Sequence, residues 1–341
     1  MHYLITGHTG FKGSWLSLML QMQGHVVSGI ALDPPTKSLF NQTDLSKIFK
    51  HDLRLDIRNR DGIKQAVERI NPEVIIHLAA QPLVREAYRN PLETFDINVM
   101  GTLNILEAMR NLDNLRAALV ITTDKVYKNH NNLRGYIETD ELGGEDPYSA
   151  SKSAADIATQ SWVKNFARVP IAIARAGNVI GGGDWAADRI IPDLVNAYSS
   201  GKLPILRFPD AIRPWQHVLD CLNGYLQLID SQLEKGLIGE WNFGPDLSEK
   251  YSVGDLVNAF AEYWGVNGVR WNLEGSNQPF EAGYLVLDSN KARRALAWKD
   301  KLTFDQRVSW TIHWYKQSNS YYEYTRKQIQ DFLELDIVSK R

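Results

Sequence analysis

Hydrophobic residues in the first half of the chain gather in short runs that alternate with stretches of helical periodicity. Runs rich in β-branched residues predict strands at residues 3–6, 26–32, 74–78, 117–122 and 171–174, with a further short strand at 52–57. Apolar positions three and four residues apart predict helices at 14–23, 61–70, 94–110 and 149–166. Strands that alternate with helices of this length pair in parallel through right-handed crossovers.

The pattern changes after about residue 176. Glycines and prolines cluster at 177–184 and 203–214, and nine of the ten tryptophans lie beyond residue 160, although residues 241–243 still predict a strand. We therefore expect an α/β protein with a Rossmann-type, doubly wound parallel sheet and a smaller, irregular C-terminal lobe. Residues 1–176 form the first domain, to which a segment near 213–245 returns. Residues 177–212 and 246–341 form the second lobe, and the cleft between the two is the expected ligand site.

Composition narrows the range of partners. The formal net charge is -2, with no basic surplus that would favour nucleic acid. No apolar run reaches the ~18 residues of a membrane span, and the N-terminus lacks the pattern of a signal peptide. The single cysteine, Cys221, excludes an intrachain disulfide. Together these features predict a cytoplasmic protein. We expect no metal, because no cluster of His, Cys and carboxylate residues has metal-ligand spacing.

A glycine-rich segment at residues 6–13 joins the first strand to the first helix. Gly7 permits a tight turn, Gly10 lets a pyrophosphate approach the backbone, and Gly13 allows close packing of helix on strand. The helix N-terminus adds free N–H groups and the positive end of its dipole. The pattern predicts a dinucleotide site, to which the remaining loop residues Thr9, Phe11 and Lys12 also belong.

Two aspartates follow the next strands. Asp33 ends the second strand, twenty residues after Gly13, where a carboxylate can hold the ribose hydroxyls and repel a 2′-phosphate. This favours NAD over NADP, although the cation of Lys12 could tolerate an extra phosphate. Asp56, with its neighbour Ile57, is either an adenine contact or part of a solvated loop.

Two clusters could carry chemistry. Tyr148 and Lys152 lie four residues apart, which places them on one face of a helix. A nearby ammonium favours phenolate and lowers the pKa of the phenol, which can then accept a proton from a hydroxyl group. Thr123, Asp124 and Lys125 follow the strand at 117–122, at the edge of the sheet where ligands bind. They provide a hydrogen-bonding group, an acid and a base, or else form a capped turn.

These motifs together resemble the extended short-chain dehydrogenases/reductases. The glycine segment matches the pattern TGxxGxxG, and residues 77–81 (HLAAQ) match the strand segment beside the cofactor, with Leu78, Ala79 and Ala80 as cofactor contacts. Asn98 stands where the family keeps an asparagine, and Tyr148 and Lys152 match its YxxxK pair. The resemblance implies NAD as the cofactor.

Longer sequence motifs resemble those of the nucleotide-sugar 4,6-dehydratases, a group within this family. Among these enzymes they resemble most the branch that acts on CDP-glucose. They lie at residues 6–16, 123–127, 143–152, 175–192, 213–219, 241–245 and 281–288. Lys125 stands where the dTDP-glucose branch has glutamate. The resemblance reaches to about residue 316, beyond which residues 320–341 predict an amphipathic terminal helix.

The resemblance implies conversion of CDP-glucose to CDP-4-keto-6-deoxyglucose for deoxysugar and surface-polysaccharide synthesis. Tyr148, with Thr123 and Lys152, takes the C4 hydroxyl proton, Lys125 takes the C5 proton, and Asp124 protonates the departing C6 hydroxyl. Asn98 orders the site. The substrate contacts are expected at Asn178, Arg189, Arg207, Arg213, Trp215, Glu281 and Tyr284.

The sequence leaves open the oligomeric state of the protein and the reaction and substrate for which it is specific. By resemblance, the helices at 94–110 and 149–166 pair across a homodimer, although the same faces could pack within one chain. An epimerase would keep Tyr148 and Lys152 without needing the acid and base at Asp124 and Lys125. Two other functions are possible from the sequence. One is a dehydratase for another nucleotide sugar, and the other is a non-catalytic NAD-binding scaffold.

Overall fold

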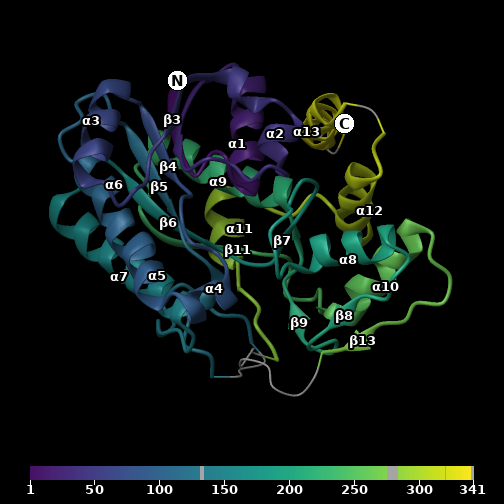
Figure 1. Cartoon of the computed structure of the whole chain (residues 1–341). Coiled ribbons are helices and arrows are strands. Elements are labelled where there is room, and N and C mark those ends of the chain that lie inside the picture. The colour runs from purple at the N-terminus through teal and green to yellow at the C-terminus, as the bar shows by residue number, and fades with distance from the viewer. Residues whose placement is uncertain (131–133, 275–282, 319, 339–341) are drawn as a thin grey trace.

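The computed structural model describes residues 1–130, 134–274, 283–318 and 320–338. Its centre is a seven-stranded sheet in the order β11-β6-β5-β4-β1-β2-β3, in which all neighbours are parallel (Figure 1). The strands are β1 (His2–Thr6), β2 (Val26–Ala31), β3 (Phe49–Arg54), β4 (Val74–His77), β5 (Ala117–Ile121), β6 (Ile171–Ala176) and β11 (Gly239–Phe243). The order of the strands reverses between β1 and β4, so the crevice at their carboxyl ends is the expected ligand site of the doubly wound fold.

Helices cover both faces of the sheet and also form much of the C-terminal lobe (Figure 1). They are α1 (Phe11–Met22), α2 (Leu39–Gln42), α3 (Arg60–Ile70), α4 (Val84–Arg89), α5 (Pro91–Phe95), α6 (Thr102–Met109), α7 (Pro147–Phe166), α8 (Ile190–Ser199), α9 (Val218–Lys235), α10 (Val253–Trp264), α11 (Asn290–Leu296), α12 (Phe304–Tyr315) and α13 (Tyr321–Val338). Side chains of β1 alternate between two apolar layers, because successive residues of a strand face opposite sides. Leu4 packs with α3, α6 and α7, whereas Tyr3 and Ile5 pack on the side of α1 and α9.

Among the described residues, most of the core of the C-terminal lobe is continuous with the core of the sheet. Trp215, Phe260 and Trp314 belong to the same buried apolar cluster as the α1 side of the sheet. The short strands of this lobe form two-stranded pairs: β7 (Val179–Ile180) with β10 (Gln216–His217), β9 (Ile212–Arg213) with β12 (Tyr251–Ser252), and β8 (Ile205–Leu206) with β13 (Asn272–Leu273). In the described part of the chain, every helix is too short or too polar to cross a membrane.

Two predicted elements differ from the structure. The strand predicted at 52–57 starts and ends three residues earlier, as β3, so Asp56 follows the strand instead of ending it. The helix predicted at 94–110 is interrupted by a π-helical turn, η2 (Asp96–Gly101). There Asn98 is turned toward Gln81 and Ser151, and a side chain at Gly101 would collide with Ile57. These tertiary contacts leave no local pattern in the sequence.

A buried carboxyl group lies where α9 meets the segment before α12. The Oδ1 atom of Asp220 accepts a hydrogen bond of 2.7 Å from the Lys301 backbone N–H, while its Oδ2 atom is buried without a hydrogen-bond partner in the described structure. Burial, reinforced by the neighbouring Asp300 carboxylate, raises the pKa of Asp220 to about 7. The native state therefore holds this proton more tightly than the unfolded chain does.

We predict that Asp220→Asn makes stability less dependent on pH. An acid whose pKa rises on folding destabilises the native state progressively as pH increases from the unfolded pKa near ~4 to the folded value, here by a few kcal/mol at most. The amide keeps the acceptor for Lys301 and carries no charge. Urea unfolding at pH 5 and pH 8 should show a smaller loss of stability in the variant than in the parent chain. Asp113→Asn, at an exposed position, is the control. An equal loss of stability in Asp220→Asn and in the parent chain would contradict this explanation.

Candidate active site

The glycine loop after β1 is a close-packed cradle at the N-terminus of α1, with no room for a side chain at Gly7 or Gly13. Gly7 has a φ of +73°, and a Cβ atom there would lie 2.8 Å from the Ala79 backbone nitrogen. A Cβ on Gly13 would lie 2.2 Å from the Gly7 carbonyl oxygen. Gly10 is the N-cap of α1, and no side chain caps this first turn. The loop therefore leaves backbone N–H groups and a positive dipole end facing the crevice, as a pyrophosphate requires.

The two aspartates predicted near this loop lie in different surroundings. Asp33 follows β2 with 87% of its side chain exposed, 3.2 Å from the Arg54 Nε atom. Asp56 is held by Arg58, whose hydrogen bonds lower the pKa of that carboxyl group. Ile57 is buried. Asp33 is thus open to a ligand, whereas Asp56 is committed to Arg58. No local sequence pattern indicates Arg54, because its approach to Asp33 depends on the pairing of β2 with β3.

The segment after β4 packs tightly against the glycine loop. The Ala79 N–H donates to the Thr6 hydroxyl at 3.2 Å, and Leu78 and Ala80 flank this contact. Asn98 accepts from the Gln81 N–H at 2.8 Å and donates to the Ser151 hydroxyl at 2.8 Å. Asn98 therefore joins the β4 segment to the helix that carries the tyrosine and lysine.

Tyr148 and Lys152 lie in the first turns of α7, beside the end of β5. The Lys152 ammonium donates to the Ile121 carbonyl at 2.9 Å. Burial, with the nearby Lys12, lowers the pKa of Lys152 to about 8. Burial raises the pKa of Tyr148 to about 12, against the opposing effects of Arg189 and a hydrogen bond to Thr123. The expected lowering of the tyrosine pKa by its cationic neighbours is therefore outweighed in this structure.

The acid and base expected after β5 begin a short 3-10 turn, η3 (Asp124–Val126), with Thr123 as its N-cap. Asp124 is only 1% exposed and its Oδ1 atom accepts from the Thr123 hydroxyl at 2.8 Å. Its Oδ2 atom is buried without a partner in the described residues. Lys125 is half-buried at the same edge. Thr123 thus contacts both Asp124 and Tyr148, which brings the two predicted clusters together.

The predicted substrate contacts are scattered over the C-terminal lobe. Arg189 is close enough to Tyr148 to influence its pKa, and Asn178 follows β6 in a left-handed conformation with φ of +48°. Arg207 faces Glu274 at 3.9 Å, and Arg213 is buried on β9. Glu281 lies outside the described residues. Trp215 is buried and its indole N–H donates to the Ser252 carbonyl, an arrangement that serves packing.

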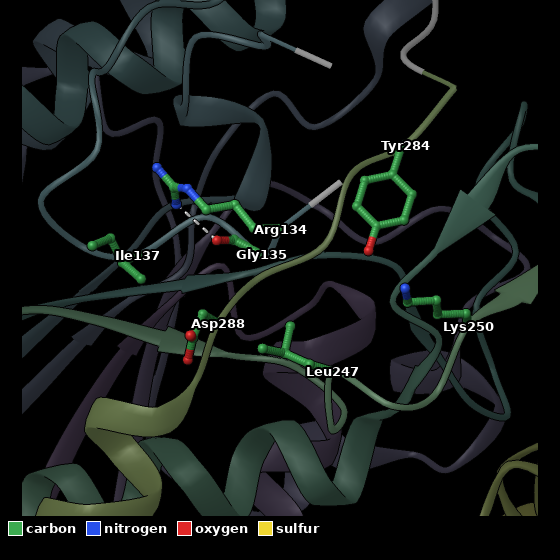
Figure 2. A pocket seen from close by; sticks show the side chains of 7 residues that line it. All are labelled: Arg134, Gly135, Ile137, Leu247, Lys250, Tyr284 and Asp288. Atoms are coloured by element: carbon green, nitrogen blue, oxygen red, sulfur yellow. Dashed lines mark hydrogen bonds between the residues drawn. The ribbon is translucent and has the colours of Figure 1, made fainter. Parts of the chain in front are cut away.

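One cavity of the described structure lies mostly apart from these side chains. It measures about 470 Å³ and is lined by Arg134, Gly135, Ile137, Leu247, Lys250, Tyr284 and Asp288. Figure 2 shows Tyr284 and Lys250 on one side of it and Arg134 and Ile137 on the other. Of the predicted substrate residues that the structure describes, Tyr284 alone lines this cavity. Among the described residues, no group of His, Cys, Asp or Glu is arranged to hold a metal ion.

A buried ion pair between β6 and α7 stabilises the site. Arg175 on β6 donates to both carboxylate oxygens of Asp156 on α7, each at 2.8 Å, and both side chains are inaccessible to solvent. The Thr122 hydroxyl at the end of β5 donates to the same carboxylate at 3.0 Å. Asp156 lies one helical turn after Lys152. The pair was not predicted, because a lone arginine in a strand does not indicate its partner.

The parallel sheet, the glycine loop and the tyrosine–lysine helix define the class of extended short-chain dehydrogenases/reductases. Residues 4–311 match the model of the family described as GDP-mannose 4,6 dehydratase, and the chain belongs to this family. A relative from Salmonella typhimurium, "CDP-glucose 4,6-dehydratase", is 41% identical over 323 residues, which cover 92% of this chain and 89% of the relative.

Solved structures share the fold at lower identity. The dTDP-glucose 4,6-dehydratase of Bacillus anthracis in complex with NAD matches with a TM-score of 0.79 and 22% identity, over 95% of this chain and 99% of that one. The UDP-glucuronic acid 4-epimerase of Bacillus cereus, in complex with UDP-glucuronic acid and NAD, matches with a TM-score of 0.80 and 23% identity, over 96% and 100%. At these identities the likeness establishes the fold alone.

We predict that Arg175→Met destabilises the protein by ~3–5 kcal/mol, because it leaves the Asp156 carboxylate buried without a counter-charge. Urea unfolding measures the loss. Arg116→Met serves as the control, since Arg116 forms an exposed pair with Glu73 at 3.7 Å, and exposed pairs contribute only ~0–1 kcal/mol. A loss no larger than in the control would show that the buried pair does not stabilise the fold.

Proposed function

We propose that the chain is an NAD-dependent hydro-lyase that converts CDP-glucose to CDP-4-keto-6-deoxyglucose. The observation that carries this proposal is the buried acid Asp124 with Lys125 at the same sheet edge, joined to Tyr148 through Thr123. Oxidation alone requires the tyrosine and lysine, whereas loss of water also requires an acid and a base. The relationship to the Salmonella protein supports CDP-glucose as the substrate.

The crevice fits NAD. The glycine loop packs so closely on its neighbours that Gly7 and Gly13 admit no Cβ, and it leaves an uncapped helix N-terminus for the pyrophosphate. Asp33 offers an exposed carboxylate for the ribose. When bound, NAD would supply the hydride acceptor for oxidation at C4 of the sugar and the hydride donor for reduction at C6. Thr9, Phe11, Lys12 and the segment from Leu78 to Ala80 would complete the site. We leave Asp56 out of it, because Arg58 occupies that carboxylate.

Tyr148 acts as the base of the oxidation step. Its phenolate accepts the proton of the C4 hydroxyl. Thr123 holds the phenolic oxygen of Tyr148 in place by hydrogen bonding. Lys152, whose pKa of about 8 lies above neutrality, retains its proton and favours the phenolate. The positive charge of oxidised nicotinamide would favour the phenolate further. Asn98 holds α7 in this position through Ser151.

Asp124 and Lys125 act in the elimination step. The C4 ketone acidifies the C5 hydrogen, because the carbanion left behind is an enolate. Lys125 in its neutral form takes this proton, and Asp124 gives its proton to the C6 hydroxyl, which departs as water. Arg189, Arg207 and Arg213 are the proposed ligands of the diphosphate, since guanidinium groups match phosphate oxygens. We place the reaction in the cytoplasm, where the unpaired Cys221 stays reduced.

The test of the proposed function offers the purified chain NAD together with CDP-glucose, dTDP-glucose, GDP-mannose or UDP-glucose in separate reactions. We expect mass spectrometry to show loss of one water from CDP-glucose alone. In Tyr148→Phe, turnover should fall at least ~10²-fold while NAD still binds, because the proton acceptor is gone and the cradle is intact. Water loss from another sugar would overturn the nucleotide, and full activity of the variant would overturn the role of Tyr148. An isomerised sugar without water loss would favour an epimerase.

We also propose that two copies of the chain form a homodimer through the helices around α7. Leu92 on α5, Met100 on η2 and Ile157 on α7 are 86%, 50% and 53% exposed. These helices are neighbours on one face of the molecule (Figure 1). Large apolar side chains gathered on one exposed face are typical of protein–protein contacts.

Ile157→Glu is expected to convert the dimer to a monomer, because it buries a charge in the proposed interface. Analytical ultracentrifugation measures the change. Ile238→Glu is the matched control, since Ile238 is 58% exposed and belongs to the segment before β11 and not to α5, η2 or α7. A wild-type chain that sediments as a monomer, or an equal effect of both substitutions, would contradict the proposed interface.

A further inference from the structure

A glycine that sequence reasoning did not single out stands against the buried acid. Gly177 directly follows β6, and a Cβ atom on it would lie 1.9 Å from Asp124 Oδ2 and 2.0 Å from Asp124 Cγ. Side chains never approach so closely, so Asp124 can keep this position only beside glycine. The φ of Gly177 lies outside the left-handed region, so space and not backbone freedom requires glycine here.

Few other contacts fix the orientation of the Asp124 carboxyl group. Its Oδ1 atom accepts the Thr123 hydroxyl at 2.8 Å, while Oδ2, the atom nearest to the missing Cβ, is buried without a hydrogen-bond partner in the described residues. A buried oxygen without a partner costs free energy, and a site keeps one where it serves another purpose. The backbone of Gly177 is therefore one wall of the space that orients Asp124.

The two strand ends cannot easily move apart to admit a side chain. The Thr122 N–H donates to the Ala174 carbonyl at 2.9 Å, which pairs the end of β5 with β6. The Asp156 carboxylate accepts from both Thr122 and Arg175, so it ties the same two strands to α7. A substitution at Gly177 must therefore displace the side chain of Asp124 and not the backbone.

We propose that Gly177 is a positioning residue for Asp124, and that it governs the dehydration half of the reaction. The inference rests on the proposed function. In that half, Lys125 takes the C5 proton, the C5–C6 double bond forms, the C6–O bond breaks, and the Asp124 proton leaves with the hydroxyl as water. Oxidation at C4 uses Tyr148 and does not require the Asp124 proton. Displacing Asp124 should therefore separate the two halves.

The test follows a single turnover of full-length Gly177→Ala with NAD and CDP-glucose. We expect reduced nicotinamide to form within about 3-fold of the wild-type rate, while water loss slows by roughly 10²-fold or more, as for removal of a general acid. Asp124→Asn should show the same separation. The control is Gly244→Ala, because Gly244 follows the neighbouring strand β11 and a Cβ there would meet no atom closer than 3.4 Å. It should leave both steps unchanged.

Equal slowing of both steps in Gly177→Ala, or no slowing of either, would overturn the proposal. Unfolding provides a second readout that does not depend on turnover. Gly177→Ala should lower the urea midpoint in the wild-type chain and much less in the Asp124→Ala background, because the colliding carboxylate is then absent. An equal loss in both backgrounds would also overturn the proposal. A wild-type chain that forms neither reduced nicotinamide nor water would contradict the proposed function, while the unfolding comparison still decides the contact.

Discussion

The buried ion pair between Arg175 and Asp156 fixes the distance between α7 and the ends of β5 and β6. Two groups of the proposed reaction depend on that distance. Lys152 lies one helical turn before Asp156 and reaches the carbonyl of Ile121 at the end of β5. Asp124 follows β5 and touches the backbone that follows β6. The pair contains no reacting group, yet it holds the proposed base and acid at one edge of the sheet.

Burial shifts the pKa values of Tyr148 and Lys152 on α7 in opposite directions. It disfavours the charged form of each, which raises the pKa of Tyr148 and lowers that of Lys152. A tyrosine that is neutral in the protein alone and favoured as phenolate beside a cationic ligand would become a base only when the site is filled. Under the proposed function, the low dielectric that opposes ionisation also strengthens each interaction made in the assembled site.

The alternation of strands and helices in the first half could be predicted from the sequence because each element carries its own periodicity. The glycine loop and the Tyr148–Lys152 spacing are local for the same reason. The π turn at Asn98 and the shifted strand β3 could not be predicted, since contacts with distant segments decide them. The contact between Gly177 and Asp124 likewise joins two strands that are remote in sequence. The roles of the site residues stay predictions.

The proposed reaction is tested most directly by following the hydrogen at C4 of the sugar. CDP-glucose that carries deuterium at C4 would be converted with unlabelled NAD in ordinary water, and the product examined by NMR and mass spectrometry. If a single site performs oxidation, elimination and reduction, the deuterium should appear at C6. Deuterium lost to the solvent or to free cofactor, or deuterium retained at C4, would contradict the proposed sequence of steps.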